Sequence, residues 1–241
     1  MDNPKFFDSK NTLNLFGLDK NFLFLSTLYE KQKLPKVSLI SGIKGIGKST
    51  LVNHFLFSIF DSKNYNKKNF SLLENSIFYK QFKNELFPNI IYIKGSDFKS
   101  VKIDDIRNLK NKIFKTTILS KDRFIIFDDI ELFNLNSLNA LLKIIEEPNN
   151  NNFFFLINNK AKPLLDTIKS RALEIKIIIN ENQRVNIINE LVNFFKIDPV
   201  LSPKLSQLTP GNFLKFNHIF NEYEISISND FIDNLAIVLD L

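Results

Sequence analysis

The segment Gly42–Ser49, Gly-Ile-Lys-Gly-Ile-Gly-Lys-Ser, constrains this chain more than any other, because it matches the pattern G-x-x-x-x-G-K-[ST] in full. The apolar run Val37–Ile40 precedes it, and the helix-like stretch Thr50–Phe60 follows. A strand, a tight turn and a helix in this order form a phosphate-binding loop. The alternative is a glycine-rich turn with an incidental lysine, and the flanking strand and helix favour the phosphate-binding loop. The sequence therefore predicts an α/β fold that binds a nucleoside triphosphate or descends from a protein that bound one.

This loop supplies the candidate nucleotide-binding residues. They are Gly42, Gly45, Gly47, Lys48, Ser49 and Thr50. The glycines let successive backbone N–H groups turn inward toward an anion, and the N-terminus of the following helix adds a partial positive charge. Lys48 is expected to reach the β- and γ-phosphates, and the Ser49 hydroxyl is expected to be a ligand of Mg²⁺. ATP and Mg²⁺ are therefore the expected cofactors.

The acidic pair Asp128-Asp129 is the second candidate part of the site. It follows the apolar run Phe124–Phe127, where P-loop proteins hold Mg²⁺ with one acid and orient the attacking water with the next. Asp128 suits the metal role and Asp129 the catalytic role. Many ATPases of this type have glutamate at the second position, and a misplacement of about 1 Å can lower a rate roughly 10²-fold. The pair has a second interpretation, as the polar end of a buried strand.

Composition argues against several classes of protein. The chain has no cysteine and only two histidines, His54 and His218, so we expect no disulfide and no zinc site. There is no N-terminal signal segment, and no apolar run approaches the ~20 residues of a membrane-spanning helix. We therefore expect a soluble, cytoplasmic protein with no membrane partner. The net charge of +6 suits nucleic acid, but the abundant Lys, Asn, Ile and Phe all have A/T-rich codons, so genome composition can account for much of the lysine.

Five short apolar runs predict the strands of a parallel sheet, because near-continuous Ile, Phe and Val suit strands buried on both faces. They are Val37–Ile40, Ile90–Ile93, Phe124–Phe127, Phe153–Ile157 and Glu174–Ile178. Helical patterns alternate with them, one after Asp104 and one from Asn136 to Glu147 that Pro148 closes. This alternation predicts a doubly wound α/β domain with a five-stranded parallel sheet.

The pattern becomes helical after this domain. A 3.6-residue apolar period begins at Asn180, a short helix is predicted at Pro203–Leu208, and another at Phe213–Tyr223. Three segments follow from these boundaries. They are a nucleotide-binding domain at 1–178, a small all-helical lid domain at 179–228, and the start of a further helical domain at 229–241.

Two longer segments carry a family resemblance. Asn139–Pro148, Asn-Ala-Leu-Leu-Lys-Ile-Ile-Glu-Glu-Pro, closely resembles the helix ending in Glu-Glu-Pro that marks bacterial clamp-loader subunits. Leu164–Ala172 is similar to their Ser-Arg-Cys segment, with alanine in place of cysteine. Shorter matches are Leu15–Gly17, Leu34-Pro35, Asn84–Asn89 and Ile103–Leu109. The similarity covers nearly the whole chain, which is identified as a member of the AAA+ clamp-loader family of bacterial DNA polymerase III, with its delta-prime and gamma/tau branches.

The resemblance implies partners and two further site residues. The partners would be gamma/tau and delta clamp-loader subunits, with the sliding clamp and primed DNA reached through the complex. Arg171 would be a catalytic arginine finger for the ATP of a neighbouring subunit, although an isolated Ser-Arg pair would be an ordinary surface feature. Asn158 would be a polar sensor of the γ-phosphate or a turn residue. Nucleotide transfer would belong to the holoenzyme, a DNA-directed DNA polymerase.

The chain also departs from the family pattern. The four-cysteine zinc module of many relatives is absent or replaced by Asp61–Pro88, which we predict as loop and helix over the sheet. Gamma-type motors have an arginine in the lid that senses the γ-phosphate, and this chain has Leu214 near that position. Asp129 takes the place of the catalytic glutamate. Relatives continue into a helical collar, and 229–241 would be the start of a collar that is truncated or missing.

Other polar residues have plainer interpretations. Arg107 would face DNA or a partner subunit, and Arg123 would cap the start of its strand. Arg184 opens the lid and would touch nucleotide or solvent, with solvent preferred. His54 is expected to pack inside the domain, and the run Asn149–Asn152 to form an exposed turn.

These observations favour an interaction subunit over two other functions. In the first hypothesis the chain is a delta-prime stator that helps load the clamp during DNA replication and donates Arg171, with slow or absent ATP hydrolysis of its own. The alternative is a gamma/tau-like ATPase motor, supported by the complete phosphate-binding loop. A DNA-binding module driven by charge ranks last, because no aromatic residues interleave with basic ones in a way that suggests base stacking.

Overall fold

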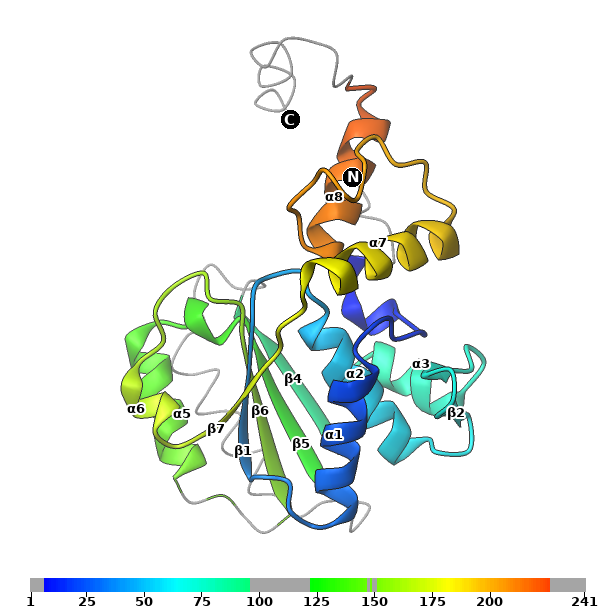
Figure 1. Cartoon of the computed structure of the whole chain (residues 1–241). Helices are drawn as coiled ribbons and strands as arrows, with labels where there is room; N and C mark the ends of the chain where they lie inside the picture. Colours follow the sequence, from blue (N-terminus) through cyan, green and yellow to red (C-terminus); the bar gives the residue numbers. More distant parts are fainter. Residues whose placement is uncertain (1–6, 96–121, 147, 149–150, 226–241) are drawn as a thin grey trace. The chain divides into compact units, whose positions relative to one another are not determined.

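The computed structural model describes residues 7–95, 122–146, 148 and 151–225. The chain divides into two compact units, Met1–Ile178 and Ile179–Leu241, and each is described by itself (Figure 1). The expectations for Arg107, for the helix after Asp104 and for 229–241 lie outside the described residues.

The first unit is built on a parallel sheet. Its strands are β1 (Val37–Ser41), β4 (Ile90–Lys94), β5 (Arg123–Asp128), β6 (Asn152–Asn158) and β7 (Leu173–Lys176). They lie in the order β4-β5-β6-β1-β7, and every neighbouring pair is parallel. The predicted five-stranded parallel sheet and α/β fold class are therefore confirmed. The last strand begins one residue earlier and ends two residues earlier than predicted, since only residues 173–176 pair with β1.

Burial on both faces holds only for the central strands. β1, β5 and β6 are buried along their whole length. β4 is half-buried throughout, and in β7 only Ile175 is buried, because these two strands form the edges of the sheet. The exposed, charged residues of β7 suit an edge strand, which must avoid pairing with another chain.

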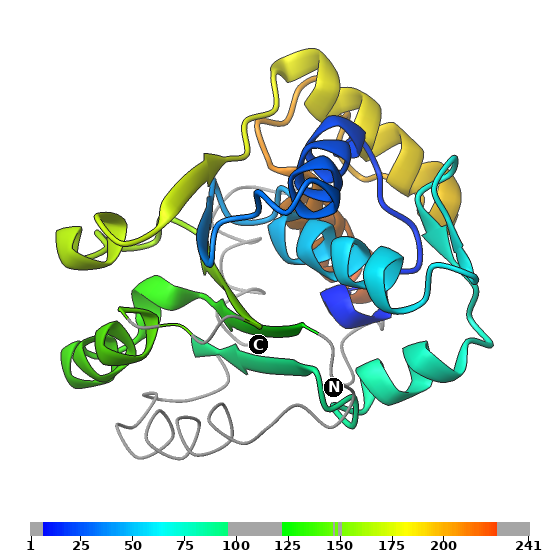
Figure 2. The ribbon, with the colours of Figure 1, turned by 90° about the horizontal axis from the view of Figure 1, so that it is seen from below.

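Helices cover both faces of this sheet (Figures 1 and 2). The helical segments of the unit are η2 (Ser9–Asn11), α1 (Asp19–Glu30), α2 (Lys48–Phe60), α3 (Ile77–Lys83), η4 (Ile130–Leu132), α5 (Leu135–Ile145) and α6 (Asp166–Lys169). Side chains of β5 alternate between the two faces, as a strand requires. Ile125 and Phe127 join the core beneath α5 and α6, whereas the Phe124 ring contacts Phe55 of α2 with centroids 5.9 Å apart. The strands therefore contribute to two apolar layers.

The segment Asp61–Pro88 contains the predicted loop and helix, together with a short hairpin that the sequence analysis missed. The hairpin pairs β2 (Tyr65–Asn66) with β3 (Ser71–Leu72) in antiparallel fashion. A second boundary also differs, because Asn152 is the first residue of β6 and not part of an exposed turn. The helix expected over Asn136–Glu147 is α5, which Asn134 caps through a hydrogen bond from Ser137 N.

The second unit contains two described helices, α7 (Glu181–Phe195) and α8 (Pro210–Glu222). Asn180 caps α7 with a full capping box, and Pro210 occupies the first turn of α8, where its fixed φ suits a helix start. The helix predicted at Pro203–Leu208 is wrong. This segment forms a single turn and a loop, and the carbonyls of Pro203 and Leu208 accept hydrogen bonds from a side chain instead of a helical backbone.

That side chain is Arg184, and the preferred expectation that it faces solvent is also wrong. Arg184 is buried within the second unit, where its guanidinium donates to Pro203 O at 2.9 Å and Leu208 O at 3.0 Å. It also pairs with Glu181 one turn earlier in α7, at 2.5 Å. Arg184 therefore holds the loop between α7 and α8 against α7 through hydrogen bonds to its backbone. Among the residues that the structure describes, no helix has the length and apolar character to cross a bilayer.

Candidate functional site

The candidate site lies at the carboxyl edge of the sheet, because the phosphate-binding loop follows β1 and the acidic pair ends β5. These strands are parallel and separated only by β6, so their carboxyl ends come together. Gly45 and Gly47 have φ values of 86° and 92°, a region that favours glycine. Gly47 is the N-cap of α2, which begins at Lys48, so the helix N-terminus opens toward the loop as the sequence predicts.

Gly42 lacks a side chain for a different reason, which is close packing. A Cβ added there would lie 2.5 Å from Ile46 Cδ1 and 2.7 Å from the backbone oxygen of Ile177. We expect Gly42→Ala to lower the free energy of unfolding by about 1–3 kcal/mol, because the backbone after β7 must move to make room. Chemical denaturation measures this loss. Ile43→Ala is the control, since Ile43 is 64% exposed in the same loop and its truncation should be nearly neutral.

Lys48 is buried at the centre of the loop. Its Nζ donates to the backbone oxygens of Gly42 and Ile43, each at 2.8 Å. Burial lowers the pKa of Lys48 to about 8, although nearby carboxylates, Asp128 foremost, oppose the shift. The ammonium group therefore already lies within the loop, where a phosphate would provide a stronger, charged acceptor.

Ser49 and Asp128, the two residues with predicted metal roles, are in direct contact. Ser49 Oγ donates to Asp128 Oδ2 at 2.6 Å. Hard oxygen donors of this kind suit Mg²⁺, which usually keeps several water and phosphate ligands. Among the described residues no cluster of three or more His, Cys, Asp or Glu forms a metal site, so most ligands of such an ion would come from nucleotide and water. The residues fit a magnesium ion held in that way.

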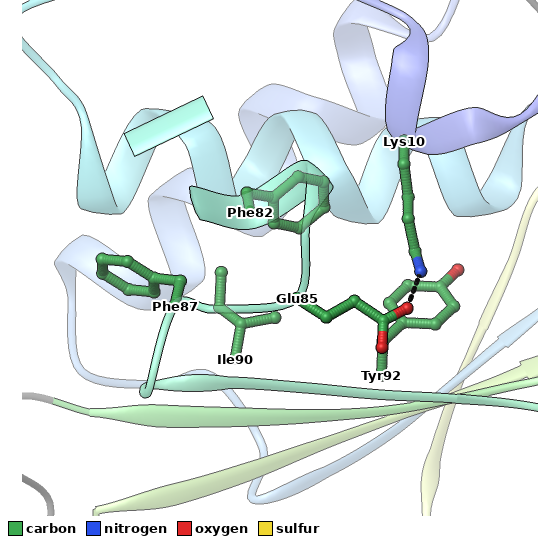
Figure 3. A pocket seen from close by; sticks show the side chains of 6 residues that line it. All are labelled: Lys10, Phe82, Glu85, Phe87, Ile90 and Tyr92. Carbon is green, nitrogen blue, oxygen red and sulfur yellow. Dashed lines mark hydrogen bonds and ion pairs between the residues drawn. The ribbon is translucent and has the colours of Figure 1, made fainter. Parts of the chain in front are cut away.

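Tyr92 of β4 is a site residue that the sequence analysis missed. Its hydroxyl donates to Asp128 Oδ2 at 2.8 Å, the oxygen that Ser49 also contacts. Burial raises the pKa of Tyr92 well above its usual value, so it remains a donor, and burial likewise raises the pKa of Asp128. Figure 3 shows the Tyr92 ring beside Lys10, whose Nζ lies 4.9 Å from the ring centroid and pairs with Glu85. A single tyrosine in an apolar strand gave no signal for this contact.

Asp129 is buried and its carboxylate has a partner. Asn159 Nδ2 donates to Asp129 Oδ1 at 2.6 Å. The backbone of Asp129 has φ 52° and ψ 44°, a left-handed conformation that aspartate tolerates better than most residues. This turn places Glu131, also buried, against the loop after β6, where its carboxylate accepts from the backbone N–H of Asn159 at 3.1 Å. The two acids thus connect the ends of β5 and β6.

Asn158 and Asn159 differ in what they contact. Asn158 is buried at the end of β6, and its Oδ1 accepts from Lys160 N at 2.8 Å, a local turn of the kind that asparagine favours. Asn159 points to Asp129 instead. Thr50 lies in the first turn of α2 and is half-buried. Sequence reasoning weighed only Asn158, because a run of two asparagines does not indicate which one turns inward.

Arg171 lies away from these residues on the same unit, immediately after α6. Its side chain is 38% exposed and pairs with Glu146 at the end of α5, with Nη2 2.8 Å from Oε1. The structure therefore places Gly42, Lys48, Ser49, Asp128 and Asp129 together and leaves Arg171 on the surface.

Two expectations about packing residues hold. His54 is fully buried in α2, where Tyr65 Oη lies 3.1 Å from Nδ1 and the Thr12 carbonyl oxygen 3.2 Å from Nε2, so it is a packing histidine. Arg123 is the first residue of β5 and is buried. Leu214, near the place of the family's lid arginine, is buried in α8.

Together, the parallel sheet, the phosphate-binding loop after β1 and the acidic end of β5 define a P-loop protein of the AAA+ class. The fold is similar to that of a Thermotoga maritima RuvB variant, with a TM-score of 0.52 over 99% of this chain and 72% of that one, at 14% identity. A family model described as "DNA polymerase III, delta subunit" matches residues 18–182. The chain belongs to this family, and so to the clamp-loader family of DNA polymerase III, which confirms the resemblance found in the sequence.

Individual relatives agree with this assignment. The chain is 25% identical over 219 residues to the DNA polymerase III subunit delta' of Bacillus subtilis, covering 88% of this chain and 60% of the relative. It is 27% identical over 150 residues to the subunit gamma of Buchnera aphidicola from Acyrthosiphon pisum, covering 61% and 39%. It is 34% identical over 76 residues to the subunit delta' of Pseudomonas aeruginosa, covering 32% and 23%. The chain thus spans less than two thirds of the length of these relatives.

Proposed function

We propose that this chain acts in the cytoplasm as the delta-prime subunit of a DNA polymerase III clamp loader. In this role it completes the loader with gamma/tau and delta subunits, and helps place the sliding clamp on primed DNA. It donates Arg171 to the ATP site of a neighbour. Membership of the family and the relatives named delta' support the proposal. The proposal also includes a domain boundary at residue 178 and the roles in nucleotide binding, metal binding and catalysis that the sequence analysis assigns.

The observation that carries the proposal is the contrast between Asp129 and Arg171. Asp129 is buried, and Asn159 holds one of its carboxylate oxygens at 2.6 Å, so it is poorly placed to orient an attacking water. Arg171 is the opposite case, an exposed guanidinium in a segment that matches the family's finger. A chain with a weak hydrolytic centre and an accessible arginine suits a subunit that completes its neighbour's site.

Nucleotide binding is a separate part of the proposal. ATP would lie on the loop Gly42–Ser49, with Lys48 on the β- and γ-phosphates and Thr50 and Asn158 beside them. A magnesium ion held by Ser49 and Asp128 would neutralise phosphate charge. The contact of 2.6 Å between these two side chains supports a formed site and also favours the second candidate, a gamma/tau-like ATPase motor.

Steady-state ATPase activity separates the two candidates. The purified chain is assayed alone, and then with gamma/tau and delta subunits, sliding clamp and primed DNA. For a stator we expect no measurable turnover by the chain alone, and Arg171→Ala should slow the mixture far more than Lys48→Ala does. Turnover by the chain alone that Lys48→Ala abolishes would contradict this proposal and establish a motor.

ATP affinity depends on Lys48 whichever candidate is correct. We expect Lys48→Ala to weaken Mg²⁺–ATP binding by about 100-fold, because hydrogen bonds to charged groups contribute about 1.5–3 kcal/mol and this one lies in a buried loop. Titration of the isolated chain with a fluorescent ATP analogue measures the change. Lys44→Ala, an exposed lysine of the same loop, is the control. Equal affinities for wild type and Lys48→Ala would show that the loop does not hold phosphate.

A further inference from the structure

The two segments that carry the family resemblance contact each other through one ion pair. Arg171 Nε donates to Glu146 Oε1 at 2.9 Å, and Arg171 Nη2 lies 2.8 Å from the same oxygen. Glu146 is the first glutamate of the Glu-Glu-Pro segment, and Arg171 is the arginine of the Ser-Arg segment. Residues 25 positions apart in sequence are therefore joined at the surface.

This pair leaves one edge of the guanidinium available. The side edge, Nε and Nη2, is on Glu146, and Nη1 donates to the Thr167 carbonyl oxygen at 3.0 Å. The end edge carries one further N–H on Nη1 and one on Nη2. Within the described part of the chain, the one remaining contact of the guanidinium is a weak hydrogen bond from Nη1 to Ser170 Oγ at 3.4 Å. Two parallel N–H groups of this kind match two oxygens of a phosphate.

We propose that Glu146 is a positioning residue for Arg171. By holding the side edge of the guanidinium, it directs the end edge outward, toward the γ-phosphate of an ATP molecule bound to a neighbouring subunit. This inference rests on the proposed function, since it assumes that Arg171 acts in trans. Glu146 itself contacts no nucleotide.

The backbones behind this pair are fixed by a common core. Glu146 is the C-cap of α5, whose Leu141 and Ile145 lie in the same buried cluster as Leu164 and Ile168 from the segment before Arg171. The two side chains therefore extend from a rigid platform, and only their rotamers remain to be set. Because an arginine side chain loses considerable rotamer entropy when it is ordered, fixing it before the partner arrives favours the productive contact.

Glu146 has an opposing effect, because its charge reduces the attraction of Arg171 for phosphate. Both side chains are partly exposed, at 38% for Arg171 and 45% for Glu146, so water and salt screen that charge. Orientation of the planar guanidinium is not screened. Positioning should therefore outweigh the loss of charge, and the net benefit of an exposed pair should be modest.

The test is a double-mutant cycle in the reconstituted loader with primed DNA. Arg171→Ala, Glu146→Ala, Glu146→Gln and the double variant Glu146→Ala/Arg171→Ala are compared with wild type. We expect Glu146→Ala to lower kcat about fivefold with little change in KM for ATP, and Glu146→Gln, which keeps an acceptor, to lose less than about twofold. In the Arg171→Ala background, Glu146→Ala should have no further effect, because the residue acts through Arg171.

Other outcomes overturn the inference in distinct ways. Additive effects of the two substitutions would make Glu146 a structural residue. Faster turnover in both Glu146 variants, most marked at low salt, would make the pair inhibitory. Wild-type turnover in Glu146→Ala, while Arg171→Ala is slow, would refute positioning and leave the proposed function intact. If Arg171→Ala itself has no effect, the proposed function fails. Asp166→Asn, an exposed acid on α6 that pairs with Lys169, is the matched control.

Discussion

Removing the Arg171 side chain should slow ATP hydrolysis at the neighbouring site by about 10³-fold, the lower end of what an arginine finger contributes. The guanidinium can meet two phosphate oxygens at once and remains charged at all relevant pH values, so it stabilises charge that develops in the transition state. Single-turnover hydrolysis in the reconstituted loader measures the effect, because steady-state rates also include sites that Arg171 does not reach. ATP binding should change little, since the contact matters most in the transition state.

Two variants define what the arginine contributes. Arg171→Lys keeps the charge but not the planar fork, and we expect it to recover only a small part of the lost rate. Lys169→Ala removes a cation that is 49% exposed and two residues away, and it should leave the rate unchanged. Complex assembly is measured alongside by gel filtration. An intact complex in which Arg171→Ala hydrolyses ATP within twofold of wild type would refute the finger assignment.

The main features of the fold were accessible from sequence because each had a local cause. The phosphate-binding loop requires its glycines in sequence order, and β1, β5 and β6 are buried strongly enough to appear as continuous apolar runs. The contact between Ser49 and Asp128 then follows from topology, since both lie at the carboxyl edge of one parallel sheet. The fold class and the five-stranded sheet were therefore predicted correctly.

What the sequence did not predict depends on contacts between distant residues. Tyr92, Glu131 and Asn159 become site residues only when β4, β5 and β6 are adjacent. Arg184 was misjudged because a charged residue in the first turn of a helix usually faces solvent, whereas here two loop carbonyls compensate for its burial. The loop at Pro203–Leu208 follows from the same contacts.

Asp129 shows why the distinction between stator and motor needs the structure. From sequence alone, the arguments against hydrolysis were its shorter side chain and Leu214 near the place of the lid arginine. In the structure Asp129 adopts a left-handed conformation and is buried, and its Oδ1 accepts a hydrogen bond from the side-chain amide of Asn159. The hydrogen bond to Asn159, rather than side-chain length alone, is therefore the stronger reason to expect slow hydrolysis.

Acid should unfold the first unit largely through His54. Burial lowers the pKa of this histidine from 6.5 to about 3, so between these values the unfolded chain binds more protons than the folded chain. The free energy of unfolding must then fall as the pH drops through this window, at up to about 1.4 kcal/mol per pH unit. Between pH 6.5 and pH 5 the loss amounts to about 2 kcal/mol, and by pH 3 to about 4 kcal/mol, because the folded histidine is itself half protonated there.

Urea denaturation of wild type and His54→Gln at pH 7, 6 and 5 isolates this contribution, because acidic residues titrate in both proteins. His54→Gln should be less stable at pH 7, since it alters contacts with Tyr65 and Thr12, but it should lose about 2 kcal/mol less than wild type on acidification to pH 5. His218→Gln, which replaces the only other histidine and is partly exposed on α8, should follow the wild-type curve. Parallel curves for wild type and His54→Gln would mean that His54 can be protonated in the folded chain, so that its burial would not be the source of acid sensitivity.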